Sequence, residues 1–262
     1  MTESRKAADW LAYNDLAWTE RLLADPEDYR AEAEPCIDLI RRAASGPVDT
    51  LLHLGSGAGG HDRFFKQAFQ VTGVDLSPGM LALARAAHPE VDYIEGDMRA
   101  VRLGRTFDAV AIPDSSDYLC TRSDIECTLA TAAAHLKPGG VLLFVAKPAE
   151  SFSNNNFAYT GERDGIHITV LENNYVRPPG DEQYEATLVY LIRQGGELDV
   201  QVDHHRLGLF TQATWEQAFR EQELNLHQQD LEGIYEPFMI AEGEYPMRVF
   251  IGIAPGGGDA EA

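Results

Sequence analysis

Positively charged residues are scarce in this sequence, which has 21 Lys and Arg against 42 Asp and Glu among its 262 residues. The resulting formal charge of −21 at pH 7 repels the phosphate backbone of nucleic acids. Apart from the pair Arg41 and Arg42 in a helix-like stretch, the chain has no cluster of Lys and Arg. Nucleic acid is therefore not expected as a partner, and the acidity is interpreted as a source of solubility.

Long apolar runs and paired cysteines are also missing. The longest apolar run, 141–146, is far shorter than the about 20 residues that cross a bilayer. The polar N-terminus MTESRKAADW lacks the apolar core of a signal peptide. The three cysteines are odd in number and form no C-x-x-C pair, which favours reduced thiols. We therefore expect a soluble cytoplasmic protein with no membrane partner.

Metal ligands at a recognisable spacing are absent as well. The only His pair is His204 and His205, and adjacent residues of a strand point to opposite faces. No metal site is expected.

Strand-like and helix-like segments alternate through the first half of the chain. A helical pattern at 9–44 comes first, and short apolar strands then alternate with helices, with the strands expected at 51–54, 71–76, 91–97, 107–112 and 141–146. Ser77 followed by Pro78 predicts one helix start, and Ser123 with Glu126 predicts a capping box at another. Apolar strands that alternate with helices predict a parallel sheet covered on both faces.

The pattern changes after the fifth strand. Three β-rich runs with hairpin-like breaks follow, at 166–176, 183–193 and 197–210. A helix at 214–222 and two strands at 224–230 and 247–254 then return to the main sheet. The expected fold is α/β, with a doubly wound, mostly parallel seven-stranded sheet and an antiparallel β insert. The predicted parts are an N-terminal helical cap (1–46), a Rossmann-like domain (47–150 and 211–255), the insert (151–210) and a disordered tail (256–262).

Glycines follow the first strand in the stretch LLHLGSGAGGHD. Gly55, Gly57 and Gly59 permit positive φ and let another molecule approach the backbone. Asp75 comes about 20 residues after Gly55, where a carboxylate can accept hydrogen bonds from ribose hydroxyls. Asp97, after the third strand, can accept from an adenine amino group. Gly55, Gly57 and Gly60 also match the G-x-G-x-x-G pattern of dinucleotide-binding loops. Both a dinucleotide and S-adenosylmethionine therefore fit the loop.

The set of motifs carries more information than the loop alone. The glycine loop, GVDLSPGML, EGDMR, FDAV and LKPGG come in the order and spacing of class I S-adenosylmethionine-dependent methyltransferases, which the chain resembles over about 28–255. The resemblance implies S-adenosylmethionine as cofactor. It also implies these cofactor-binding residues: Tyr29, Gly55, Ser56, Gly57, Gly59, Asp75, Leu76, Met80, Asp97, Met98 and Pro113.

A closer likeness involves the segments 28–33, 57–61, 97–110 and 205–219, which resemble the sugar-nucleotide N,N-dimethyltransferases of deoxyaminosugar biosynthesis. However, PDSSDYL at 113–119 is equally similar to the D-S-x-N-Y-L stretch of many functionally unassigned methyltransferases. The expected acceptor is a small-molecule amine, with a nucleotide-linked aminosugar as one candidate. The alternatives are O-methylation of a small metabolite, a non-catalytic cofactor-binding protein and an NAD-dependent oxidoreductase.

Two positions depart from the family pattern. His53 stands where an acidic residue is usual, and Ser56 where Cys is frequent. Two interpretations of His53 stay open. It is a tolerated replacement at a buried strand end, or it alters the affinity for the cofactor or the pH dependence of that affinity.

The catalytic candidates gather near the fourth strand. An amine needs only to be neutral when it attacks, whereas a hydroxyl acceptor needs a base. Asp114 and Tyr118 follow that strand, although Asp114 and Asp117 can also cap the next turn and Tyr118 can simply pack in the core. Tyr13 is a candidate for closing the site. The resemblance adds His205, two residues after Asp203. The insert is expected to cover the cofactor mouth, and its pairing with a second copy in a homodimer stays open.

Overall fold

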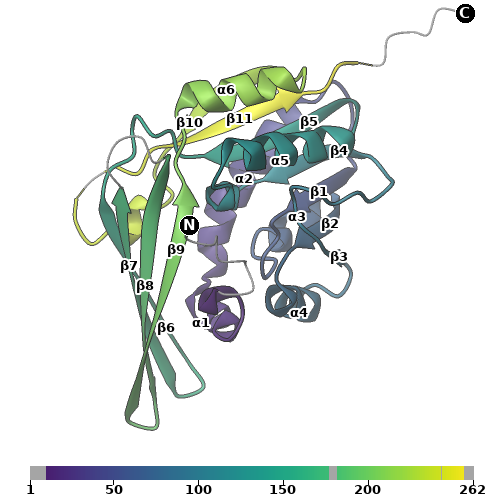
Figure 1. The fold of residues 1–262 in the computed structure, drawn as a ribbon. Coiled ribbons are helices and arrows are strands. Elements are labelled where there is room, and N and C mark those ends of the chain that lie inside the picture. The colour runs from purple at the N-terminus through teal and green to yellow at the C-terminus, as the bar shows by residue number, and fades with distance from the viewer. Residues whose placement is uncertain (1–9, 177–181, 243, 257–262) are drawn as a thin grey trace, which may run out of the picture.

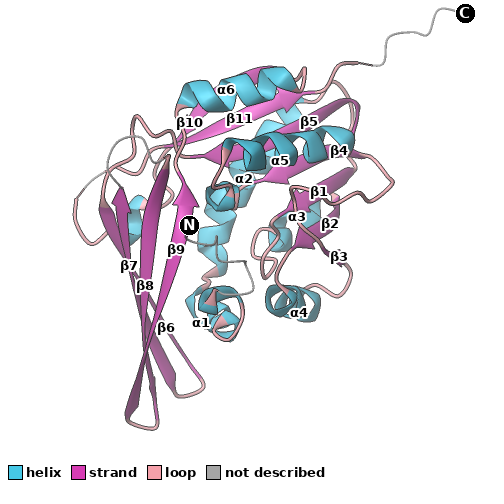
Figure 2. Ribbon diagram, in the orientation of Figure 1, coloured by secondary structure: helices cyan, strands magenta, loops and turns pink. Residues whose placement is uncertain are grey.

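The computed structural model describes residues 10–176, 182–242 and 244–256. A large twisted sheet carries helices on both faces, and a narrower antiparallel sheet stands beside it (Figures 1 and 2). Of the predicted tail, all but residue 256 lies outside the described residues, as does residue 9 of the predicted N-terminal helix.

The large sheet has seven strands in the order β10-β11-β5-β4-β1-β2-β3. They are β1 (Thr50–Leu54), β2 (Gln70–Asp75), β3 (Asp92–Glu95), β4 (Phe107–Ile112), β5 (Leu136–Ala146), β10 (Asn225–Leu231) and β11 (Met247–Ile253). β1 to β5 pair in parallel, whereas β10 and β11 are antiparallel. The predicted mostly parallel seven-stranded sheet is therefore confirmed. The central strands are apolar throughout because helices cover both of their faces.

Two layers of helices cover this sheet. α2 (Pro26–Ala43), α3 (Asp62–Ala68) and α4 (Pro78–Ala87) share one hydrophobic cluster, and α5 (Arg122–Ala134) and α6 (Gln212–Glu221) share the other. Ser77 caps α4 by accepting from the Met80 N–H, as predicted. The capping box predicted at Ser123 and Glu126 is wrong. Thr121 and Asp124 form it instead, because the backbone at Thr121 is extended and leaves its hydroxyl facing the first turn.

The N-terminal segment is less regular than predicted. In place of one continuous helix, it has the short 3-10 turns η2 (Leu11–Tyr13) and η3 (Ala17–Thr19), the single turn α1 (Glu20–Leu23), and then α2. Asp25 caps α2 and Pro26 occupies its first position, so a new helix begins there.

The second sheet has the order β6-β7-β8-β9. Its strands are β6 (Asn155–Arg163), β7 (Ile166–Val176), β8 (Gln183–Gln194) and β9 (Glu197–Gly208). The last three coincide with the predicted β-rich runs, but β6 was not predicted. Its sequence NNFAYTGER combines Phe, Tyr and Thr, which favour strands, with Asn, Ala, Gly and Glu, which are depleted in strands, so its propensity for a strand is weak. It is held by its pairing with β7.

Two glycines let this sheet approach the rest of the molecule closely. A Cβ atom on Gly161 would collide with the carbonyl of Leu22, and one on Gly208 with the carbonyl of Leu119. Leu119 directly follows the short 3-10 turn η4 (Ser116–Tyr118), which comes after β4. The inner face of the second sheet is thereby held against the loop at the carboxyl end of β4.

Candidate active site

The glycine loop between β1 and α3 turns the backbone through conformations that suit glycine. Gly55, Gly57 and Gly59 have φ values of 74°, 54° and 83°. A Cβ on Gly60 would strike the ring of Tyr29, which reaches the loop from α2. The Tyr29 hydroxyl donates to Glu20 Oε1 at 2.6 Å. Tyr29 therefore packs directly against the loop, where it was expected to contribute to cofactor binding.

Asp75 ends β2 and fastens two neighbouring segments. Its carboxylate accepts hydrogen bonds from the N–H groups of Gly57 and Ser77, both at 2.8 Å. Burial raises the pKa of Asp75, and these backbone donors oppose that shift. Each oxygen keeps a second lone pair for a ligand. Leu76, the next residue, is 44% exposed and presents an apolar side chain beside the carboxylate.

Buried polar atoms around the glycine loop are left without partners in the described part of the chain. They are Ser56 Oγ, in the loop itself, and His53 Nε2, near the end of β1. A Cβ placed on Gly57 would meet no atom within 4 Å, so the loop borders open space. Buried polar atoms are normally hydrogen-bonded, and an unpaired one is a place for a ligand or water. The loop therefore fits the S-adenosylmethionine that the sequence predicts.

His53 pairs with an acidic residue from another element. Its Nδ1 lies 2.7 Å from Asp62 Oδ1, and the Tyr93 hydroxyl donates to Asp62 Oδ2 at 2.9 Å. Burial would raise the pKa of Asp62, but His53 and Tyr93 outweigh it and lower the pKa. The first residue of α3 thus supplies a buried carboxylate beside position 53. Asp62 was not among the site residues predicted from the sequence, although it directly follows the glycine loop.

The other predicted cofactor residues lie along the same edge of the sheet. Asp97 accepts from the backbone and guanidinium of Arg99, which also binds Asp124 at 2.7 Å. Burial opposes this charge, yet Arg99 lowers the pKa of Asp97. A bond from Asp97 to an adenine amino group would therefore share oxygens already held by Arg99. Met98 is partly buried 3.8 Å from Ser115 Oγ, and Met80 and Pro113 are buried.

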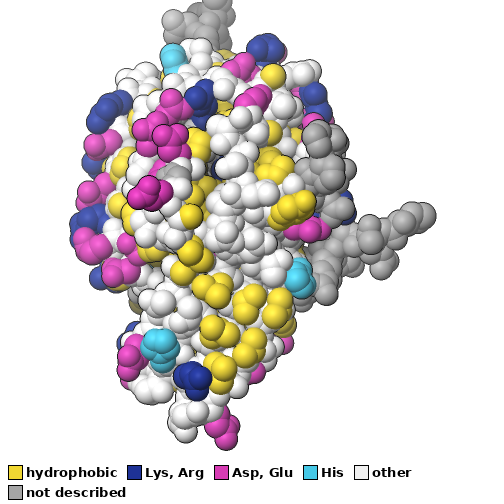
Figure 3. All heavy atoms as spheres, turned by 90° about the vertical axis from the view of Figure 1, so that its left-hand side faces the viewer, with side chains coloured by type: hydrophobic (Ala, Val, Ile, Leu, Met, Phe, Trp, Pro, Cys, Tyr) yellow, Lys and Arg dark blue, Asp and Glu magenta, His cyan; other side chains and the backbone are white. Residues whose placement is uncertain are grey.

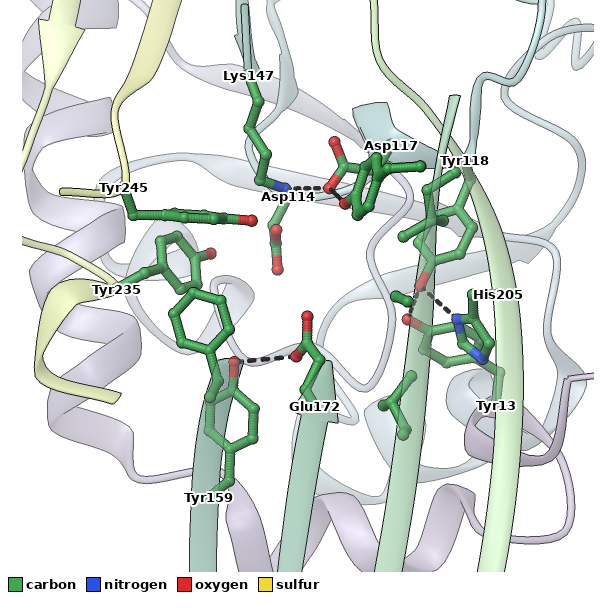
Figure 4. Close-up of a pocket in the computed structure, with 15 residues that line it drawn as sticks. Tyr13, Asp114, Asp117, Tyr118, Lys147, Tyr159, Glu172, His205, Tyr235 and Tyr245 are labelled. Atoms are coloured by element: carbon green, nitrogen blue, oxygen red, sulfur yellow. Dashed lines mark hydrogen bonds and ion pairs between the residues drawn. The ribbon is translucent and has the colours of Figure 1, made fainter. Parts of the chain in front are cut away.

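A cavity of about 150 Å³ lies between this edge and the inner face of the second sheet (Figure 4). All four predicted catalytic residues, Tyr13, Asp114, Tyr118 and His205, line it. The structure thus brings together side chains that are far apart in the sequence. Several other lining residues were not predicted from the sequence, among them Lys147, Tyr159, Glu172, Tyr235 and Tyr245.

One wall of the cavity is a chain of hydrogen bonds. The Tyr13 and Tyr118 hydroxyls are bonded to each other, and the Tyr118 hydroxyl lies 3.4 Å from His205 Nδ1. His205 Nε2 lies 2.8 Å from Asp203 Oδ2, which also accepts from the Ala12 N–H. A carboxylate that accepts from Nε2 leaves Nδ1 as an acceptor for the phenol. Burial raises the pKa of both tyrosines well above the usual value, so they act as neutral phenols.

Asp114 points into the open centre of the cavity (Figure 4). Its side chain is exposed to the cavity, although protein surrounds it on the other sides. This burial, reinforced by Glu32 and opposed by Lys147 and His61, raises the pKa of Asp114 to about 7. Asp114 accepts no hydrogen bond from the described residues, which also means that it does not cap the following turn. A carboxyl group that titrates near neutrality can hold or release a proton at physiological pH.

Lys147 follows β5 and forms an ion pair with Asp117. The Tyr184 hydroxyl donates to the same Asp117 oxygen at 2.8 Å, and the Lys147 ammonium lies 5.4 Å from the centre of the Tyr245 ring. Burial would lower the pKa of Lys147, but Asp117 raises it, so the ammonium stays charged. Asp117 therefore has a charged partner here rather than acting as a turn cap.

The described residues contain neither a candidate metal cluster nor a candidate membrane helix. No group of three or more His, Cys, Asp and Glu among the described residues is arranged to hold a metal ion. In the same part of the chain, no helix has both the length and the apolar character to cross a membrane.

Comparison with known sequences identifies methyltransferases. Residues 51–140 match a family model described as "Methyltransferase domain". The dTDP-3-amino-3,4,6-trideoxy-alpha-D-glucopyranose N,N-dimethyltransferase of Streptomyces venezuelae is 34% identical over 199 residues, 74% of this chain and 82% of that protein. The dTDP-3-amino-3,6-dideoxy-alpha-D-glucopyranose N,N-dimethyltransferase of Streptomyces fradiae is 33% identical over 203 residues, 74% of this chain and 76% of that protein.

Solved structures extend the likeness over nearly the whole chain. The crystal structure of Streptomyces venezuelae DesVI has a TM-score of 0.74 and 29% identity, covering 97% of this chain and 100% of its own. The sugar N-methyltransferase KedS8 from Streptoalloteichus has a TM-score of 0.77 at 22% identity and 97% coverage of both chains, which shows the fold alone. Coverage of this extent includes both sheets.

The position of Asp75 predicts a loss of cofactor binding on substitution. We expect Asp75→Ala to weaken binding of S-adenosylhomocysteine by about 10- to 100-fold, because hydrogen bonds to a charged group contribute about 1.5–3 kcal/mol. Isothermal titration measures this, with Asp75→Asn as the control that keeps one acceptor oxygen. Equal affinity of Asp75→Ala and the parent would mean that the ribose is held by other groups.

Proposed function

This chain belongs to the class I S-adenosylmethionine-dependent methyltransferases, within the group of the deoxyaminosugar N,N-dimethyltransferases, and we propose that it methylates the nitrogen of a small amine. The observation that carries the proposal is Asp114, a carboxyl group with no hydrogen-bond partner among the described residues, directed into the cavity with its pKa raised by burial to about 7. Such a group can hold an ammonium and accept its proton.

The reaction places a simple demand on the protein. The cofactor supplies a methyl group that is already activated by a sulfonium, so the chain's own residues must align a neutral amine and exclude water. Asp114 takes the proton from the ammonium, which leaves the nitrogen lone pair free to attack the methyl group that S-adenosylmethionine would supply when bound. The Tyr118 hydroxyl orients the nitrogen, and His205 with Asp203 fixes the direction of that hydroxyl. The second sheet covers the site.

An aminosugar is the acceptor that the relatives favour. Both Streptomyces relatives are named as N,N-dimethyltransferases of dTDP-linked aminosugars. A second methylation needs the same steps again, since the monomethyl ammonium must lose a proton before it attacks. O-methylation is the second candidate, because a carboxyl group with a pKa of about 7 can also serve as the base for a hydroxyl acceptor. Mass spectrometry of the product distinguishes the two.

We also propose a cytoplasmic homodimer. The described cysteines are free thiols, as expected in a reducing compartment. Exposed apolar side chains gather on the outer face of the second sheet (Figure 3), and they are Leu171, Tyr175, Leu198, Val200 and Val202. A contiguous exposed apolar patch commonly marks a protein–protein interface. A second copy of this chain, which carries the same apolar face, is the partner that we propose.

The pKa of Asp114 predicts a pH dependence of both rate and stability. The carboxylate form predominates above about pH 7, so kcat/KM should rise with pH through that value. Asp114→Asn should lose this rise and about 10²- to 10⁴-fold of the rate. A raised pKa favours the folded state at low pH, and this contribution is lost as pH rises towards 7. Asp114→Asn should therefore raise the melting temperature more at about pH 8 than at about pH 5. A rate within twofold of the parent would contradict the assignment.

Tyr118 predicts a loss that is specific to turnover. Tyr118→Phe keeps the ring and removes one orienting hydrogen bond, worth about 1–3 kcal/mol, so kcat should fall by about 5- to 150-fold. Affinity for S-adenosylhomocysteine should hardly change. Tyr175→Phe, on the exposed outer face, is the matched control and should behave as the parent. Unchanged kcat in Tyr118→Phe would reduce Tyr118 to a packing residue.

The outer face predicts the oligomeric state. Sedimentation analysis should find a dimer, and replacing Val200 and Val202 together by Lys should shift it to monomer by placing charges in the apolar contact. Ile240→Lys, at an exposed apolar residue outside the second sheet, should leave the dimer intact. A monomeric parent would refute the dimer without affecting the proposed reaction.

A further inference from the structure

The charges on the described cavity lining do not balance. Lys147 is its one described cation, and this ammonium is bound by Asp117. Asp114 and Glu172 also line the cavity, and no described residue forms an ion pair with either. Two carboxylates therefore face this space without a positively charged partner from the described residues.

The two carboxylates approach the cavity from opposite sides. Asp114 comes from the loop after β4 and Glu172 from β7, and both point towards the open centre (Figure 4). An unbalanced negative field from two sides favours a positive charge between them.

Glu172 is fixed in place rather than free to turn into solvent. Its Oε1 accepts from Asn174 Nδ2 at 2.7 Å, and its Oε2 accepts from the Tyr159 hydroxyl at 3.2 Å. Asn174 is fully buried and is itself bonded to Asn155 Oδ1 at 2.9 Å. A carboxylate held by two donors on a strand is preorganised for a ligand.

The remaining walls and the size of the cavity suit the same kind of ligand. The rings of Tyr159, Tyr235 and Tyr245 line it, and aromatic faces attract cations. Its volume of about 150 Å³ is smaller than the about 300–1,000 Å³ of sites for drug-sized ligands, so it can enclose only a compact group. A phosphate or diphosphate inside it would bring further negative charge to Asp114 and Glu172.

We propose that this cavity selects the acceptor by charge: the ammonium form of the amine binds between Asp114 and Glu172, and any phosphate or diphosphate of the acceptor stays outside. Glu172 is then a specificity-determining residue. This inference deepens the proposed N-methylation and rests on it for the reaction, but it concerns binding. It can therefore be tested without turnover.

The test measures binding of three sugars to the protein saturated with S-adenosylhomocysteine. Glucosamine carries the ammonium, N-acetylglucosamine lacks it, and glucosamine 6-phosphate adds an anion. Isothermal titration should show glucosamine binding at least about tenfold more tightly than N-acetylglucosamine, as expected for a charge-assisted contact. Glucosamine 6-phosphate should also bind more weakly than glucosamine, because its short link keeps the phosphate close to the two carboxylates. Glu172→Gln should reduce this preference by a similar factor and leave the affinity for S-adenosylhomocysteine unchanged, which also shows that the variant is folded.

The matched control is Glu162→Gln, an exposed residue of β6 that does not line the cavity, and it should keep the preference of the parent. The inference is overturned if the phosphate ester binds as tightly as glucosamine, if Glu172→Gln keeps the preference, or if glucosamine does not bind. If the binding pattern holds but no amine is methylated, the proposed reaction fails while the charge selection stands.

Discussion

The docking of the second sheet onto the loop after β4 creates the cavity that we propose as the acceptor site. Gly208 brings β9 against the carbonyl of Leu119, and His205 from the same strand reaches the Tyr118 hydroxyl. This contact closes the carboxyl edge of the large sheet, where ligands of open α/β folds bind. The side chain of Asp114 is exposed to the cavity below this contact, and the protein that surrounds it raises its pKa.

One carboxyl group in the cavity, that of Asp114, lowers the stability of the fold when it is ionised but serves the proposed reaction. Lys147 and Asp117 neutralise each other, whereas Asp114 is desolvated with no hydrogen-bond donor among the described residues. A carboxyl group that is surrounded by protein without a donor weakens the fold when it is ionised, but its raised pKa suits it to accept a proton at neutral pH. Stability and function therefore make opposite demands on the same side chain.

Around the glycine loop, in contrast, the carboxylates have hydrogen-bond or ion-pair partners nearby in the structure. Asp75 binds the backbone of the glycine loop and of the α4 cap, and Asp97 binds Arg99. His53 replaces the acidic residue usual at its position, yet Asp62 brings a carboxylate to it from α3. A buried carboxylate at this edge of the sheet can thus come either from the end of β1 or, as in this chain, from the start of α3.

The sequence by itself determined the positions of the parallel strands along the chain, the glycine loop and the place of Asp75 at the end of β2. These features lie within one strand–helix unit or its neighbour, where short-range spacing and periodicity decide the outcome. It also selected Tyr13, Asp114, Tyr118 and His205 as residues of the acceptor site, and all four line one cavity. Only the tertiary structure decided that Lys147 neutralises Asp117, that Glu172 faces Asp114 and that β6 is a strand. Each of these depends on partners far away in the chain or on pairing with a neighbouring strand, and no local pattern of residues encodes such a contact.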